Sequence, residues 1–376
     1  MTAPEPSPPS PAGQPPPPAL ASLPRGTRAQ VDIHCDPSPT LAPLLERLGA
    51  SVVLTVPHLG NLVVLAARQG RVRLSFHTFE RAMGVAVARH ALAVCTRTEV
   101  WFVRDAPDIA AKLHPRGHYD ACYLTRASHF TGDVQGHEAA WVQGEVWLVN
   151  TLFSCLCALH EDYSFVPRWR PPFITALAAE DRCHLNGLAL VDGAPRYATA
   201  LGETDTAGGW RANKPQGGCL LDVPSGEVVA RGLSMPHSPR RHDGRLWLLE
   251  SGTGQLVRVD PATGRRQTAA ALPGFTRGLA LCGPYAFVGL SKIRATSAMD
   301  GVPLAERREQ LKCGVAVVDL RSGQSIALLE FQTAVEEIFD VQLLPGLRFP
   351  EVMGFQKETL HHTFIIPAVR SSLPRP

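Results

Sequence analysis

Six segments of this chain repeat one pattern: polar residues, a short apolar strand, a tight turn and a second apolar strand. They begin at Arg81, Gly136, Cys183, Met235, Gly274 and Val335. Their turns recur at intervals of about 40 to 60 residues, and hairpin repeats of that period are typical of β-propeller blades. The sequence therefore predicts an all-β fold, a six-bladed β-propeller, in which the polar residues open each innermost strand at one mouth of the central channel.

The segments before the first repeat predict how the ring closes. Residues 39–49 carry the leucine spacing and the final glycine of a short helix. Residues 51–57, 61–67 and 71–79 are strand candidates, whereas little strand-forming sequence follows the last repeat. We expect these N-terminal strands to complete the blade that the last repeat begins, which removes an open sheet edge. The alternative is a seventh blade built from the N-terminal strands alone.

Composition limits the domain plan, the partners and the compartment. Residues 1–27 are rich in proline and predict a disordered tail; we expect one propeller domain over 28–367 and a flexible C-terminal tail over 368–376. No apolar stretch is long enough to cross a membrane, and the N-terminus lacks the pattern of a secretory signal. The nine cysteines, an odd number, indicate reduced thiols and a cytoplasmic protein. The 37 basic residues form no stripe, which argues against nucleic-acid binding.

Histidines and carboxylates recur in the polar lead of the repeats. The histidines are His137, His184 and His237, and the carboxylates are Glu138, Glu337 and Asp340. We expect the imidazoles to meet at the channel mouth. One of two open hypotheses is that they hold a divalent transition metal, with a carboxylate as general base on a metal-bound water. The opposing hypothesis gives these side chains a structural role, because buried polar groups at strand ends must also be paired.

The remaining polar residues of the leads predict a ligand site. They are Arg81, Asn186, Ser238, Arg240 and Arg277. Arginine forks pair with carboxylate and phosphate groups, so we expect a small-molecule ligand, including an anionic one. The alternative is a ring of salt bridges between these arginines and the carboxylates of the leads.

One insertion is predicted to add to this site. Residues 202–218 form a glycine-rich segment that carries Trp210 and Arg211 near its tip. Long loops in compact domains are often functional covers. We expect this insertion to cover the same channel mouth and to bring both side chains to the ligand.

Several strings of the sequence resemble a bacterial family of conserved hypothetical proteins, a domain of unknown function with a predicted propeller fold. They are NTLFSCLCAL (150–159), SFVPRWRPPFI (164–174), DRCHLNGLAL (181–190), LGETDTAGGWRANK (201–214), MPHSPR (235–240) and VEEIFDVQLLPG (335–346). The resemblance spans roughly residues 45–350 and implies a fold but no activity. More loosely, CHLNGLAL and GRLWLLESGTGQLVRVDPATG are similar to strands of six-bladed lactonases and strictosidine-synthase-like proteins, which keep a metal or a substrate at the channel mouth.

Two functions from different classes follow. The sequence favours a channel site that binds a small molecule, and it leaves both catalysis and a protein partner open. The alternative is a metal-dependent, lactonase-like hydrolase or isomerase that uses the channel histidines and carboxylates. The fold alone does not choose between them.

Overall fold

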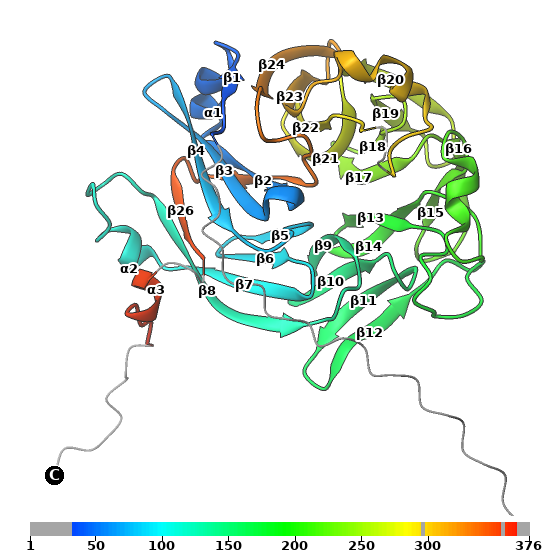
Figure 1. The fold of residues 1–376 in the computed structure, drawn as a ribbon, viewed down its shortest axis with the longest axis horizontal. Coiled ribbons are helices and arrows are strands. Elements are labelled where there is room, and N and C mark those ends of the chain that lie inside the picture. Colours follow the sequence, from blue (N-terminus) through cyan, green and yellow to red (C-terminus); the bar gives the residue numbers. More distant parts are fainter. Residues whose placement is uncertain (1–31, 295–297, 355–357, 367–376) are drawn as a thin grey trace, which may run out of the picture. The chain divides into compact units, whose positions relative to one another are not determined.

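The structure of the chain, a computed structural model, describes residues 32–294, 298–354 and 358–366. In this part of the chain six sheets surround a central axis (Figure 1). The predicted six-bladed β-propeller is thereby confirmed. All six sheets belong to the compact unit that spans Ile33–Pro376. Both predicted tails, 1–27 and 368–376, lie outside the described residues.

Blades 1 to 3 follow the first three repeats. Blade 1 contains β5 (Val85–Ala88), β6 (Ala91–Cys95), β7 (Glu99–Asp105), β8 (Ala121–Phe130) and, parallel to β8 at its outer edge, β26 (Pro350–Met353). Blade 2 contains β9 (Gly136–Val142), β10 (Glu145–Asn150), β11 (Cys155–His160) and β12 (Tyr163–Trp169). Blade 3 contains β13 (Leu185–Val191), β14 (Ala194–Ala200), β15 (Gly218–Asp222) and β16 (Val228–Leu233).

Blades 4 to 6 complete the ring. Blade 4 contains β17 (Pro236–His242), β18 (Arg245–Glu250), β19 (Gln255–Val259) and β20 (Arg266–Ala271). Blade 5 contains β21 (Phe275–Cys282), β22 (Tyr285–Ser291), β23 (Gly314–Asp319), β24 (Gln324–Phe331) and, at its outer edge, β1 (Cys35–Pro37). Blade 6 contains β25 (Val341–Pro345), β2 (Ala50–Val56), β3 (Asn61–Arg68) and β4 (Arg71–Thr78).

Blade 6 closes the ring as the sequence predicts. Its innermost strand, β25, comes from the last repeat and pairs antiparallel with β2, in a register that places Leu54 opposite Val341. The helix α1 (Leu41–Leu48) precedes β2, ends at Gly49 in the left-handed conformation, and buries its leucines in the core of blades 5 and 6. The two ends of the propeller therefore share one sheet.

Tight turns fix the register of the inner hairpins. Two-residue hairpin turns of type I′ need a positive φ at both central residues, which favours glycine at the second. Both φ angles are positive in the turns β9–β10, β13–β14 and β17–β18, at Gln143-Gly144, Asp192-Gly193 and Asp243-Gly244. These turns set which side chains of each inner strand point to the channel.

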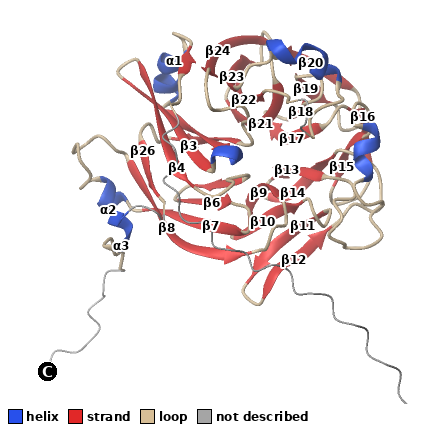
Figure 2. Cartoon of the chain, in the orientation of Figure 1, coloured by secondary structure: helices blue, strands red, loops and turns tan. Residues whose placement is uncertain are grey.

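The helical segments lie outside the sheets (Figure 2). They are α1, α2 (Pro107–Ala110), α3 (Glu358–His361) and the 3₁₀ turns η1 (Pro57–Leu59), η2 (Gly209–Asn213) and η3 (Pro303–Gln310). None of the helices in the described ranges is long and apolar enough to cross a membrane. All nine cysteines are free thiols, as the odd count indicates.

Candidate functional site

A cavity of about 320 Å³ opens at one mouth of the channel. Every blade contributes to its lining at or near the start of the innermost strand: Met83, His137, His184, His237, Arg277 and Phe339. Further walls come from Leu201, Trp210, Met235, Phe275, Met299, Lys292, Arg294, Glu336 and Glu337. The three histidines of the polar leads thus line one cavity at one mouth of the channel.

His137, Arg277 and Phe339 form the floor of this cavity. The rings of His137 and Phe339 lie 4.8 Å apart, and the guanidinium carbon of Arg277 lies 3.5 Å from the centre of the Phe339 ring. The same three residues border a polar void of about 10 Å³ on the far side of the floor, space for about one water molecule. His237 also lines both spaces.

The hydrogen bonds of His137 leave neither ring nitrogen open to the cavity. Arg277 donates from Nη2 to Nε2, so the proton of the neutral ring lies on Nδ1. Nδ1–H donates to the hydroxyl of Thr151 (3.1 Å), which in turn donates to the carbonyl of Leu185 in blade 3 (2.6 Å). His137 therefore joins two blades and seats Arg277.

His237 has a similar arrangement at Nδ1 two repeats further along, but its Nε2 is not bonded to an arginine. Its Nδ1–H donates to the carbonyl of Met235 (2.9 Å) and contacts the hydroxyl of Ser251 (2.8 Å), which donates to the carbonyl of Thr276 in blade 5. Nε2 of His237 has no partner among the described residues. This histidine therefore presents an unprotonated acceptor nitrogen at the cavity wall.

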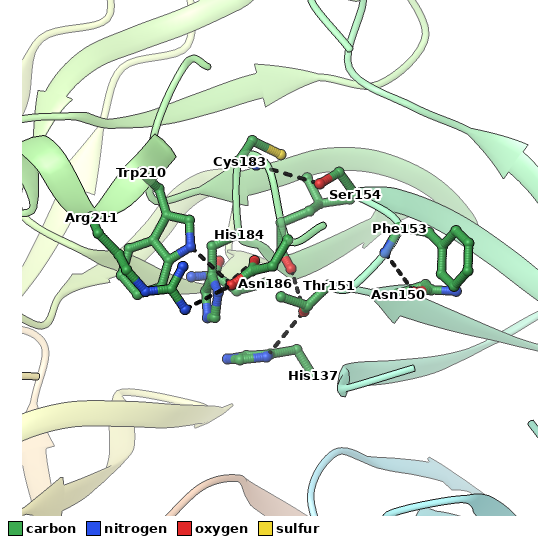
Figure 3. A network of polar contacts seen from close by, with 12 residues as sticks. His137, Asn150, Thr151, Phe153, Ser154, Cys183, His184, Asn186, Trp210 and Arg211 are labelled. Carbon is green, nitrogen blue, oxygen red and sulfur yellow. Dashed lines mark hydrogen bonds and ion pairs between the residues drawn. The ribbon is translucent and has the colours of Figure 1, made fainter. Parts of the chain in front are cut away.

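His184 is held by a carboxylate. Its Nδ1 lies 2.9 Å from Oδ1 and 3.1 Å from Oδ2 of Asp181, so Nδ1–H donates to Asp181. Asp181 also accepts from Nε1 of Trp210 (2.9 Å) and from Nη2 of Arg211 (3.3 Å). In Figure 3, His184 stands between Trp210 and His137. Its Nε2 has no partner within the described ranges, and 15 % of its side chain is exposed.

All three imidazoles are neutral near pH 7. Burial lowers the pKa of His137 and of His237 well below the ordinary value of histidine, and the charge of Arg277 lowers both pKa values further. Burial also lowers the pKa of His184, although Asp181 acts in the opposite direction. The site thus contains three neutral imidazoles. Both nitrogens of His137 are bonded, whereas Nε2 of His184 and of His237 has no partner among the described residues.

Arg277 is the most buried cation of the site. It forms a salt bridge with Glu337 (3.1 Å), and only 9 % of its side chain is exposed. Desolvation lowers its pKa to about 10, while Glu337 and Asp340 act in the opposite direction. Arg277 therefore stays charged at neutral pH.

The other predicted site residues of the inner strands bind the next blade. Oε2 of Glu138 accepts from the amide of Leu188 (2.8 Å), and Nδ2 of Asn186 donates to the carbonyl of Pro236 (3.0 Å). The hydroxyl of Ser238 accepts from the amide of Gly278 (3.2 Å), and Asp340 accepts from the amide of Val85 (2.8 Å). Burial raises the pKa of both carboxyls. These four side chains lie beside the polar void and form a ring of bonds between blades.

Of the other two predicted arginines, Arg240 belongs to this ring of bonds and Arg81 lies at the exposed edge of the cavity. Arg240 pairs with Glu138 and donates to the carbonyls of Leu188 and Leu279, so it belongs to the ring of bonds between blades. Arg81 lines the cavity and lies 3.8 Å from Asp133, with much of its side chain exposed. The salt bridges that the alternative hypothesis expects are thus present for Arg240 and Arg277.

From the insertion over residues 202–218, Trp210 lines the same cavity. The ring of Trp210 is 4.4 Å from that of His184 and is 2 % exposed. It packs in one cluster with Leu201, Met235 and Phe275. The guanidinium of Arg211 lies 4.3 Å from the Trp210 ring. Trp210 therefore forms a packed wall of the cavity, and Arg211 lies outside it on the surface.

The comparison with protein families decides where this chain belongs. A family model described as a domain of unknown function, DUF4915, matches residues 39–353. The chain belongs to this family. The match covers every strand of the propeller except β1. The DUF4915 description carries no activity, so function rests on the site itself.

Solved structures similar to this DUF4915 chain are distant in sequence. A chain of a nidogen/laminin complex is 11 % identical, with a TM-score of 0.49 over 79 % of this chain and 99 % of that chain. A protein of unknown function from Bacteroides caccae is 9 % identical, with a TM-score of 0.49 over 78 % and 98 % of the two chains. No protein with a curated description matches the chain.

The donor set of this DUF4915 site does not fit a transition metal. Among the described residues no three His, Cys, Asp or Glu side chains are grouped so that they could hold a metal ion. Nε2 of His137 is occupied by Arg277, and Asp340 and Glu138 are turned to backbone amides below the floor. We therefore derive no step through a metal.

Two residues of the site escape sequence reasoning. Asp181 lies three residues before His184, and both have a positive φ, of 49° and 51°. That backbone turns the carboxylate onto the imidazole. Lys292 follows β22 and lines the cavity, and its ammonium makes no hydrogen bond or ion pair with the described residues. Asp181 could have been found as an acidic neighbour of a channel histidine; Lys292 lies outside the repeated lead.

Proposed function

We propose that the cavity binds a small organic anion that also carries hydroxyl groups. One observation supports this most: the cavity presents an unpartnered ammonium, Lys292, together with two unpartnered acceptor nitrogens, on His184 and His237. Polar groups in folded proteins are normally paired, and groups left open in a cavity are available to a ligand. An ammonium takes an anionic oxygen, whereas a neutral imidazole nitrogen takes a hydroxyl proton.

The charges around the cavity favour an anion. Four cationic side chains line it against two carboxylates: Arg81, Arg277, Lys292 and Arg294, with Glu336 and Glu337. Glu337 pairs with Arg277, and Glu336 lies 3.7 Å from Arg294. Among the described residues, Lys292 is left as the lining cation without a counter-charge, and we place the anionic group of the ligand there.

Size and wall composition limit the ligand to a small molecule. The volume of about 320 Å³ is at the lower end of the range for small-molecule sites. The walls are aromatic and sulfur-containing, with Trp210, Phe275, Phe339, Met83 and Met235. Such walls can pack against the apolar face of a carbon chain or ring while the three polar groups fix its orientation.

Binding of gluconate, which carries one carboxylate and several hydroxyls, tests the proposal. Isothermal titration calorimetry at pH 7.5 should give stronger binding of gluconate than of acetate, which lacks the hydroxyls, or of sorbitol, which lacks the anion. Lys292→Met should weaken gluconate binding at least tenfold, about the contribution of one charge-assisted contact. Lys112→Met, an exposed lysine of blade 1 outside the cavity, is the matched control. Equal affinity for gluconate in both variants would contradict the proposal.

A further inference from the structure

His184 and Asp181 form a pair with a geometry that the binding of an anion does not require. The carboxylate receives three donors, from His184, Trp210 and Arg211, and its side chain is 8 % exposed. It is therefore fixed in place, and it fixes both the tautomer and the orientation of the His184 ring. We infer that Asp181 and His184 are a general-base dyad that activates water for the metal-independent hydrolysis of a carboxylic ester or lactone. The inference rests on the proposed ligand site, because the same cavity must hold the ester.

The groups around His184 keep its Nε2 unprotonated at neutral pH. Asp181 favours the imidazolium, whereas burial, Arg277 and Arg211 disfavour it, and the net effect lowers the pKa. The neutral ring of His137 packs edge-on against it at 4.9 Å. An imidazole that is neutral, oriented by a carboxylate and open at Nε2 can accept a proton at neutral pH.

In this inference the nucleophile is water. None of the described residues that line the cavity is a serine, threonine or cysteine, so no hydroxyl or thiol side chain can attack a ligand there. Water bound at Nε2 of His184 gives its proton to that nitrogen while its oxygen forms a bond to the ester carbonyl carbon. The carbonyl oxygen takes up the electron pair as an oxyanion, and Lys292 is the unpaired cation available to stabilise it.

The second half of the reaction returns the proton. The intermediate collapses, the bond from the carbonyl carbon to the ester oxygen breaks, and the leaving oxygen takes the proton from Nε2 of His184. Water and ester are consumed, and an alcohol and a carboxylic acid are formed; at neutral pH the acid then loses its proton to the solvent and becomes a carboxylate. The products are a carboxylate and a hydroxyl, the two groups for which Lys292 and the open imidazoles are suited.

Chemical modification tests the dyad without knowledge of the natural substrate. Diethyl pyrocarbonate acylates unprotonated imidazole nitrogens, so at pH 7 it should modify His184 faster than His137, whose Nε2 is occupied by Arg277. Asp181→Asn should slow the modification of His184 about tenfold, the lower end of the effect of removing an orienting partner from a metal-bound histidine. Rates are read by mass spectrometry of the peptides. Modification of His184 no faster than that of His137 would overturn the inference.

Hydrolysis of p-nitrophenyl acetate and of dihydrocoumarin, measured in the presence of EDTA, tests the reaction. We expect turnover that EDTA does not change, with kcat at least about 100-fold lower in His184→Gln. His160→Gln removes an exposed histidine that lies 3.8 Å from Asp162, and it is the matched control. The rate should rise with pH to a plateau reached below neutral pH. Loss of turnover with EDTA, or wild-type rates in His184→Gln, would overturn the inference.

Failure of the two proposals would look different. If wild-type protein binds gluconate but hydrolyses neither probe above the buffer rate, the dyad inference is overturned and the ligand site stands. If both probes are hydrolysed in a His184-dependent manner without gluconate binding, the proposed ligand class is wrong and the dyad stands.

Discussion

The guanidinium of Arg277 contacts three residues that line the cavity. It pairs with Glu337, donates to His137 and lies over the ring of Phe339. Removing one partner of a buried ion pair leaves the other charge without compensation. Arg277→Met should therefore lower the free energy of unfolding by about 3 kcal/mol, measured by urea denaturation. The surface pair of Arg321 and Asp319 provides the control, and Arg321→Met should change the free energy of unfolding much less than Arg277→Met does. Equal effects would show that the floor contributes no more than a surface pair.

His237 makes stability depend on pH. Burial and Arg277 hold its pKa well below the ordinary value, whereas in the unfolded chain the ring titrates near about 6.5. The unfolded state therefore binds more protons below that pH, so the contribution of His237 is present above about pH 6.5 and is lost as the pH falls. The free energy of unfolding should fall from pH 7 to pH 5.5, with at most about 1.4 kcal/mol per pH unit from this residue.

The variant His237→Asn isolates the contribution of His237 to the pH dependence of stability. The asparagine amide can still donate to the carbonyl of Met235, but it does not titrate. Urea denaturation at several pH values should give a shallower pH dependence than in the wild type. An unchanged slope would show that His237 is not held neutral by the fold.

At the level of single residues, the sequence predicts positions better than partners. His137, His184 and His237 recur in the polar leads, so their meeting at one mouth follows from the repeat. What each ring binds does not follow, because the hydroxyls of Thr151 and Ser251 come from the ends of other strands. These tertiary contacts determine which imidazole nitrogens are bonded and which are available to a ligand.

At the level of elements, the close approach of neighbouring blades limits which side chains the inner strands can carry. A Cβ at Gly187 would lie 2.3 Å from Oγ1 of Thr199 and 2.4 Å from Cδ of Pro239, in the next blade. Gly187→Ala should therefore cost about 1–3 kcal/mol of stability through overpacking. Gly136→Ala is the control, because its Cβ would meet only Cβ of Cys95, at 3.9 Å. The stability of the two variants is compared by thermal and urea denaturation. Equal stability would mean that β13 and β17 are less tightly packed against each other than the distances at Gly187 indicate.

Strands of the repeat are predictable, and strands added to the edges are not. The pairing of β25 with β2 follows from counting strands before the first and after the last repeat. The short strands β1 and β26 add to the outer edges of blades 5 and 1, through three and four residue pairs. Nothing in so short a segment distinguishes a strand from a loop, because its pairing is decided by the neighbouring edge. The mouth at which Trp210 lies is predictable, because its insertion joins β14 to β15 beside that mouth.

For the whole molecule, six blades converge on one cavity, and the donor set of its described residues does not fit a transition metal. Protein purified without a histidine tag should contain far less than one equivalent of any transition metal by elemental analysis. We expect EDTA to leave its thermal midpoint unchanged, because a metal would stabilise the folded state only by binding to it. A stoichiometric metal that is lost together with thermal stability would show that the channel histidines rearrange around an ion.

The most direct test of the account is the protonation state of the three channel histidines. Long-range ¹H–¹⁵N spectra of histidine-labelled protein at pH 7.5 distinguish the two neutral tautomers and the imidazolium, and His→Asn variants assign each ring. We predict that His137, His184 and His237 all carry their proton on Nδ1, with Nε2 unprotonated, as their hydrogen bonds require. A proton on Nε2 of His184 or His237, in either a neutral tautomer or an imidazolium, would contradict the proposed ligand site and the dyad together.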